Sequence, residues 1–117
     1  MIKDNHIAAA GGITAAITGA RKMATHMLKI EVEVESFPQI EEALQAGADI
    51  IMLDNMSIED MTKAVEMIGG KALVEASGNM GDKDLLSVAK TGVDIISIGA
   101  LTHSVRSMDI SLRFTVK

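Results

Sequence analysis

AGADIIML (residues 46–53) returns later in the chain as TGVDIISI (residues 91–98). Each copy has a glycine that ends a helical pattern, then an aspartate, then Ile-Ile at the start of an apolar run. Helices that alternate with short apolar strands are typical of a parallel sheet with right-handed crossovers. The repeated stretch therefore predicts an α/β fold built from βα units.

Working outward from the two copies, four short segments are predicted to be strands. They cover residues 28–35, 48–54, 71–76 and 93–98. Their starts lie roughly 20 residues apart, which is the length of one compact βα unit. A helix followed by about four such units is about half of an eight-fold barrel of about 250 residues. We therefore expect a partial parallel (β/α) barrel, with a flavodoxin-like open sheet as the alternative.

The segments around these strands carry helix signals. Ser36 followed by Gln39 resembles a capping box, and Asp82 is the predicted cap of a later helix. Residues 12–27, ahead of the first strand, are predicted to form another helix. In a βα pattern this helix implies a preceding strand, which we expect to be missing.

Composition narrows the classes of protein that remain. The chain has 117 residues, 48% of them hydrophobic, with two Phe and neither Trp nor Tyr, so one aliphatic core is expected. The lack of cysteine excludes disulfides and fits a reducing cytoplasm, which is the location we expect. The net charge of -5 with scattered Lys and Arg argues against nucleic-acid binding. No apolar run approaches the roughly 20 residues of a membrane span.

Acidic residues interrupt the apolar pattern of the first predicted strand. Glu31, Glu33 and Glu35 alternate with valines, whereas parallel strands are normally apolar on both faces. The strand is either an edge strand with one solvated face or a barrel strand whose acidic side faces a metal ion or a cationic transition state. Asp54 ends the next strand, where α/β proteins build their sites, although an aspartate there also commonly caps a helix. Carboxylates from two adjacent strand ends suit Mg²⁺.

Small residues follow the last two predicted strands. Ser77-Gly78-Asn79 follows the third strand, and Gly99 follows the fourth, with His103 close behind it. Backbone N–H groups can approach a phosphate at such glycines because no side chain collides with it. Each feature alone is more often an ordinary turn or a solvated cap. Phosphate sites recur in the last two βα loops of barrels, however, so the combination predicts a phosphate site.

The polar tetrapeptide Lys3-Asp4-Asn5-His6 precedes the first predicted helix. Such a segment near a chain end is usually solvated, although Lys3 could bind an anionic substrate and His6 could be an orienting hydrogen-bond donor. The sequence shows no nucleophile–base motif, and its three histidines lack zinc spacing.

Six short motifs together carry a resemblance to one family of enzymes. They are MIKDNHI (1–7), EVEV (31–34), IMLDN (51–55), EASG (75–78), GALTHS (99–104) and MDISL (108–112). In this order and spacing they resemble the quinolinate phosphoribosyltransferases, and they cover essentially the whole chain. Each motif is weak alone, and the set in register is specific.

The resemblance implies a transferase of NAD biosynthesis, with quinolinate and phosphoribosyl pyrophosphate as substrates. It implies transfer of ribose 5-phosphate to the ring nitrogen of quinolinate and loss of CO₂, which gives nicotinate mononucleotide and pyrophosphate. On this resemblance Lys3 contacts a quinolinate carboxylate, while the catalytic pair Glu33 and Asp54 holds the ribose hydroxyls and Mg²⁺. The residues implied around the 5-phosphate are Ser77, Gly78, Gly99 and His103.

The chain departs from the family pattern in two ways. Asn79 stands where the family usually has a second glycine, so its amide can still bind phosphate but its Cβ leaves less clearance. The family also has an N-terminal domain and early barrel strands that supply most of the basic residues for quinolinate. We therefore expect residues 1–117 to be the C-terminal portion of the barrel domain, inactive alone and part of a homodimer or higher homo-oligomer at full length. A phosphate-binding half-barrel without turnover and a paralogous transferase with another acceptor are the alternatives.

Overall fold

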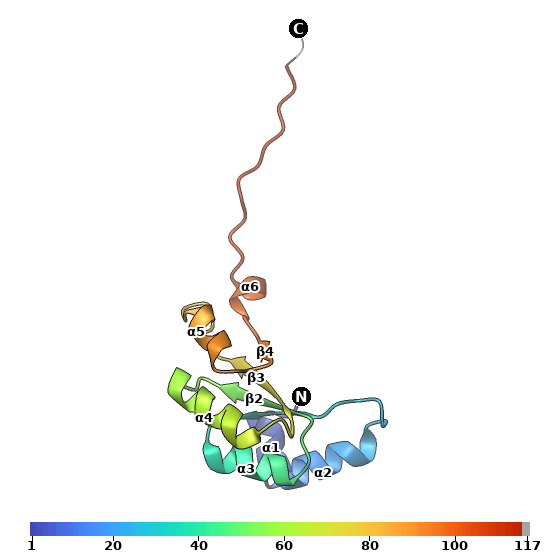
Figure 1. Cartoon of the computed structure of the whole chain (residues 1–117). Coiled ribbons are helices and arrows are strands. Elements are labelled where there is room, and N and C mark those ends of the chain that lie inside the picture. Colours follow the sequence, from blue (N-terminus) through green and yellow to red (C-terminus); the bar gives the residue numbers. More distant parts are fainter. Residues whose placement is uncertain (116–117) are drawn as a thin grey trace.

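One parallel sheet organises the chain, and its strands lie side by side in the order β1-β2-β3-β4 (Figure 1). The computed structural model describes residues 1–115. The strands are β1 (Glu31–Val34), β2 (Ile50–Asp54), β3 (Leu73–Ser77) and β4 (Ile95–Ile96). The helices are α1 (Asp4–Ala10), α2 (Ile13–Met23), α3 (Phe37–Gln45), α4 (Ile58–Ile68), α5 (Leu85–Lys90) and α6 (Ala100–His103). The predicted α/β alternation with parallel strands is confirmed.

Each strand begins two or three residues later than predicted, and the two aspartates of the repeated stretch explain the difference. Asp49 Oδ2 accepts a hydrogen bond from the N–H of Ile30 at 2.6 Å, and Asp94 Oδ2 accepts one from the N–H of Val74 at 2.8 Å. In each copy the aspartate thus lies just before its own strand and fastens the start of the neighbouring strand. The first residues of the predicted strands therefore belong to connecting segments, and hydrogen bonds from the backbone to the two aspartate side chains stabilise these connections.

Ile2 extends the sheet beyond β1. Its N–H donates to the carbonyl of Glu31 at 2.7 Å, and its carbonyl accepts from the N–H of Glu33 at 3.0 Å, forming a parallel bridge with Val32. These bonds lie on the side of β1 opposite β2. A short extended segment at Ile2 therefore precedes the helices, where the strand was expected to be missing, and β1 is not an edge strand along this segment.

The helix predicted over residues 12–27 is present as α2, which ends earlier, at Met23. A second helix, α1, precedes it and was not predicted; Gly11 and Gly12 separate the two helices, with φ angles of 86° and 144° that favour glycine. The polar tetrapeptide is exposed to solvent, as expected, and its last three residues form the start of α1. His6 Nδ1 accepts a hydrogen bond from the N–H of Lys3 at 3.0 Å, which leaves Nε2 as the nitrogen that can donate.

Two predicted helix caps are also wrong in detail. The Ser36 side chain makes no capping bond, and Gln39 Oε1 accepts instead from the N–H of Glu35 at 2.8 Å. Asp84, not Asp82, caps α5, because its carboxylate accepts from the first N–H groups of that helix at 3.2 and 3.3 Å. Residues 105–115 follow α6 without helix or strand and extend away from the sheet (Figure 1).

The two faces of the sheet have opposite character. One face packs against the helices and forms the expected aliphatic core, whose fully buried members include Val32, Val34, Ile51, Leu53, Ile13, Ile17, Ile40, Met61, Ile68 and Val88. In a parallel sheet, residues in register point to the same side, so alternate residues of each strand occupy the other face. That face carries Glu31 and Glu33 of β1, Met52 and Asp54 of β2, and Glu75 and Ser77 of β3.

No helix within residues 1–115 combines the length and the apolar character needed to cross a membrane.

Candidate functional site

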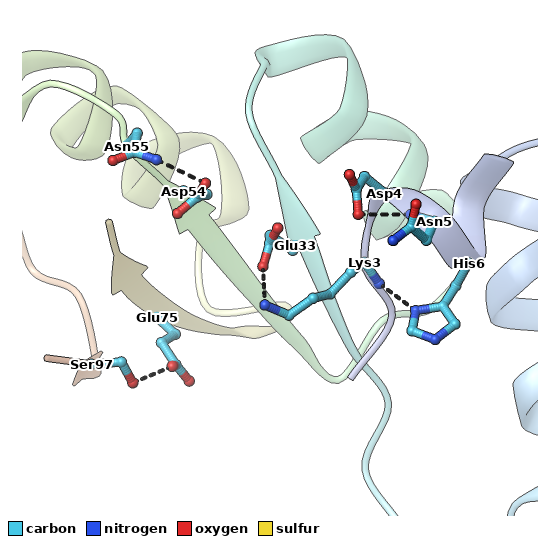
Figure 2. Close-up of polar contacts among 9 residues, drawn as sticks. All are labelled: Lys3, Asp4, Asn5, His6, Glu33, Asp54, Asn55, Glu75 and Ser97. Atoms are coloured by element: carbon cyan, nitrogen blue, oxygen red, sulfur yellow. Dashed lines mark hydrogen bonds and ion pairs between the residues drawn. The ribbon is translucent and has the colours of Figure 1, made fainter. Parts of the chain in front are cut away.

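Lys3 and Glu33 form an ion pair at the carboxyl end of β1 (Figure 2). Lys3 Nζ lies 3.1 Å from Glu33 Oε2, and the Glu33 side chain is only 17% exposed. The hydrogen bond from Lys3 to Glu33 and the charge of Glu33 raise the pKa of Lys3, and the charge of Asp54 adds to this effect. The Lys3 ammonium group is therefore within electrostatic reach of both predicted carboxylates.

Asp54 ends β2, beside Ser77 at the end of β3. Its Oδ2 accepts a hydrogen bond from the side chain of Asn55 at 2.9 Å (Figure 2). The alternative role for Asp54 was to cap the next helix, α4. Ser57 caps this helix instead, because its Oγ accepts a hydrogen bond from the N–H of Asp60 at 3.1 Å. The Asp54 carboxylate is thus not used as a helix cap.

The loops after β3 and β4 enclose a hollow of about 330 Å³. All five residues predicted for phosphate binding line it, together with Ser97 and residues of the connection to α5. The lining residues are Ser77, Gly78, Asn79, Met80, Gly81, Asp82, Ser97, Gly99, Ala100 and His103. The structure therefore brings the two small-residue loops together around one space.

Gly78, directly after β3, is in close contact with Asn55, directly after β2. Its φ is 85°, and a Cβ placed on it would lie 2.7 Å from the backbone nitrogen of Asn55, well inside normal van der Waals contact. Asn55 in turn donates its N–H to the carbonyl of Ser77 at 3.1 Å. The loops that follow β2 and β3 are thus joined directly, and Asp54 lies beside Ser77, which lines the hollow.

Asn79, in place of the family's second glycine, has a φ of 48°. This left-handed conformation is the one that asparagine adopts more readily than most residues with a Cβ. The substitution is therefore compatible with the shape of the loop, and the Asn79 backbone still lines the hollow.

His103 lines the hollow from the end of the short helix α6. A Cβ on Gly99 would lie 3.3 Å from Cδ2 of the His103 ring, so the ring packs closely over that glycine. His103 Nδ1 is 2.6 Å from Ser104 Oγ. This contact leaves Nε2 available to a ligand in the hollow.

Three residues that the sequence did not single out take part in this region: Asn55, Glu75 and Ser97. Asn55 bonds Asp54 and confines Gly78, while Ser97 Oγ donates to Glu75 Oε1 (Figure 2). The available signal was alternation, since Glu75 lies on the polar face of β3 and Ser97, directly after β4, is two residues beyond Ile95, which is in register with Glu75. The signal for Asn55 was weaker, because it consisted only of its position directly after Asp54.

Glu31 lies on the same face of the sheet, at the beginning of β1 and two residues before Glu33. Burial is the main cause that raises the pKa of Glu31, and the negative charge of the neighbouring Glu75 adds to the effect. Glu31 Oε1 is buried without a hydrogen-bond partner. These features favour the neutral form of the Glu31 carboxyl group.

Glu33 and Asp54 were predicted to hold a metal ion. Within residues 1–115, no three His, Cys, Asp or Glu side chains converge closely enough to bind a metal by themselves. Mg²⁺ commonly binds through one or two carboxylates plus waters and substrate phosphates. The two carboxylates therefore fit a metal ion held jointly with a phosphorylated ligand and do not form a protein-only site.

Four parallel strands that alternate with helices make this chain part of an α/β-barrel protein, with acids at two strand ends and a small-residue hollow at the next two. The family model described as "Quinolinate phosphoribosyl transferase, C-terminal domain" matches residues 1–113. The chain belongs to this family.

Individual relatives agree with the family match. The chain is 47% identical over 116 residues to a Bacillus subtilis protein named "Probable nicotinate-nucleotide pyrophosphorylase (carboxylating)", covering 99% of this chain and 40% of the relative. It is 37% identical over 120 residues to the Homo sapiens nicotinate-nucleotide pyrophosphorylase (carboxylating), covering 100% and 40%. The solved nicotinate-nucleotide pyrophosphorylase from Francisella tularensis is 45% identical, with a TM-score of 0.86 over 94% of this chain and 39% of that one. The chain spans about 40% of the length of these relatives.

Proposed function

We propose that this chain supplies the ribose- and phosphate-binding part of a quinolinate phosphoribosyltransferase of NAD biosynthesis. The reaction transfers ribose 5-phosphate from phosphoribosyl pyrophosphate to the ring nitrogen of quinolinate, with loss of CO₂, and releases nicotinate mononucleotide and pyrophosphate. The proposal depends on one observation: the carboxylates of Glu33 and Asp54 lie at the same edge of the sheet as the hollow after β3 and β4. Family membership supplies the substrate class.

In this proposal Glu33 and Asp54 hold the ribose hydroxyls. Breaking the bond between ribose and pyrophosphate develops positive charge on the sugar, in an oxocarbenium-like transition state. Fixed carboxylates stabilise that charge more than they stabilise the neutral ground state, so they accelerate the reaction. Glu33 is well suited because it is partly buried and its position is fixed by Lys3.

Lys3 binds an anionic group of the acceptor, a carboxylate of quinolinate. An ammonium group has three N–H donors, so Lys3 can keep its bond to Glu33 while it binds a second anion. This arrangement would connect the acceptor directly to the residue that holds the ribose.

The 5-phosphate occupies the hollow between the loops after β3 and β4. Gly78 and Gly99 let the backbone N–H groups approach the phosphate oxygens, and Ser77 and His103 add side-chain donors. Mg²⁺, bound with the substrate at Glu33 and Asp54, would neutralise charge on the departing pyrophosphate.

The complete activity belongs to a longer protein in this proposal, with residues 1–117 as the C-terminal portion of the barrel domain and inactive alone. About 60% of each relative's length lies outside the match (100% − 40%), and that part would include the N-terminal domain and the first barrel strands. We further propose a homodimer or higher homo-oligomer and a cytoplasmic location for the full protein, on the family resemblance alone.

Calorimetric titration with phosphoribosyl pyrophosphate and Mg²⁺ tests the site on this chain. We expect Asp54→Asn, which keeps the shape and removes the charge, to weaken binding by about tenfold or more. Glu66→Gln, on the exposed face of α4, is the matched control and should bind as the wild type does. Equal affinities for wild type and Asp54→Asn would refute the role of Asp54, and an unresponsive wild type would refute the assigned ligand.

A further inference from the structure

Glu75 is a buried carboxylate that the proposed reaction does not use. It lies on β3, two residues before Ser77, and only 8% of it is exposed. Burying a charged group is costly unless strong hydrogen bonds compensate it. A carboxylate in this position therefore calls for a specific partner.

That partner is Ser97, which lies directly after β4 and two residues before Gly99. Ser97 Oγ donates to Glu75 Oε1 (Figure 2), and the N–H of Ser97 donates to the carbonyl of Ala76 at 2.9 Å. Ser97 is thus attached to β3 by its side chain and by its backbone. It also lines the hollow that Gly99 and Ser77 share.

The ladder between β3 and β4 is too short to fix the Gly99 loop by itself. It pairs only Glu75 with Ile95 and Ala76 with Ile96. At its beginning the ladder is reinforced by Asp94, whose carboxylate accepts from the N–H of Val74. At its end, next to the hollow, the reinforcing side-chain bond is the one between Ser97 and Glu75.

We propose that Glu75 is a positioning residue, which through Ser97 holds the Gly99 loop at the distance from Ser77-Gly78 that a phosphate group requires. The inference rests on the proposed function, in that the ligand of the hollow is a phosphate. A hydrogen bond to a charged acceptor is roughly twice as strong as one between neutral groups. A buried carboxylate therefore fixes the serine more firmly than a neutral side chain would.

Three variants test this role with ribose 5-phosphate as the probe. Ser97→Ala removes the donor, Glu75→Leu removes the acceptor at similar size, and Glu75→Gln keeps an oxygen that can accept from Ser97. We expect the first two to weaken ribose 5-phosphate binding by about tenfold and Glu75→Gln to restore it to within about threefold of wild type. Ser107→Ala, in the exposed segment after α6, is the control.

Amide hydrogen exchange without ligand separates positioning from general loss of stability. In Ser97→Ala the amides of residues 99–101 should exchange faster, while those of Val32 and Leu53 in the core strands keep their wild-type rates. Unchanged exchange and unchanged affinity in Ser97→Ala would overturn the positioning role, and this variant remains decisive if Glu75→Leu fails to fold. Failure of the wild type to bind ribose 5-phosphate would instead overturn the proposed function, and the exchange comparison would still decide whether Glu75 fixes the loop.

Discussion

The two ends of β2 carry aspartates in opposite situations. At the beginning, Asp49 Oδ2 accepts from the N–H of Ile30 on the neighbouring strand at 2.6 Å and pairs with Arg21 Nη2 at 2.8 Å. At the other end, Asp54 accepts from the side chain of the next residue, a bond that joins no second strand. The carboxylate at the amino edge of the sheet stabilises the fold, whereas the one at the carboxyl edge makes no such contact and is the one that we propose binds a ligand.

The same division extends to the rest of the sheet. Asp94 repeats the strand-fastening contact of Asp49 at the amino edge, whereas the hollow between Ser77 and Gly99 opens at the carboxyl edge. The internal repeat of the sequence thus marks residues that build the sheet. Two residues of the candidate site, Asp54 and Gly99, come directly after the two copies, where the sequences no longer match.

Asp49→Ala should give the largest loss of stability. It removes a hydrogen bond between a charged group and a backbone N–H of a buried residue, and also an ion pair with Arg21, so we expect about 3 kcal/mol. The measurement is the free energy of unfolding in urea. Phosphate-ligand affinity of the folded variant should match wild type, and a selective loss of affinity without loss of stability would break the division between the two edges.

Gly78→Ala should give the next largest effect, at the opposite edge. The alanine Cβ collides with the backbone of Asn55 and must adopt a φ of 85°, so we expect a cost of about 2 kcal/mol in loop strain. Binding of ribose 5-phosphate should fall with it because the loop moves. Gly70→Ala is a useful control, since Gly70 has a similar φ of 75° but open space around it.

Asp94→Ala should destabilise the chain by about 1.5 kcal/mol, less than Asp49→Ala, because it removes one charge-assisted hydrogen bond and no ion pair. Urea unfolding again measures the change. A loss as large as that of Asp49→Ala would mean that Arg21 adds little and that the hydrogen bond to the strand carries the stability in both copies.

The order of the elements could be predicted because it depends on patterns within the chain. The repeat and the helix signals predicted a parallel sheet, and alternation predicted that Glu33 shares one face of its strand with Glu31 and Glu35. What could not be predicted depends on contacts between distant segments. Whether an aspartate at a strand end fastens a neighbouring strand, as Asp49 does, or stays at a site, as Asp54 does, follows from which backbone N–H lies opposite it.

Contacts across the site escaped prediction for the same reason. The bond from Ser97 to Glu75 joins residues on separate strands, and neither residue has a local motif that names the other. The contact of Gly78 with Asn55 depends on β2 and β3 lying side by side with their ends level. The helix predicted over residues 12–27 is found as α2, whereas α1 was not predicted because its first residues, Asp4, Asn5 and His6, are polar and resemble a solvated segment.

Acid should weaken the amino edge of the sheet, and this last effect is the smallest. The hydrogen bond from the N–H of Ile30, together with Arg21, lowers the pKa of Asp49 below its usual 3.8. A carboxyl group with a lowered folded-state pKa stabilises the fold above its unfolded pKa, and the contribution is lost as the pH falls through the folded value. The difference in unfolding free energy between wild type and Asp49→Asn should therefore be constant from neutral pH to about pH 5 and shrink below about pH 4.

Glu31 supplies the contrast, because its raised pKa makes its contribution to stability fall as the pH rises. Urea unfolding of Asp49→Asn and Glu31→Gln across this range should give pH dependences of opposite sign, and equal slopes for the two variants would contradict the assignment of Asp49 to the fold.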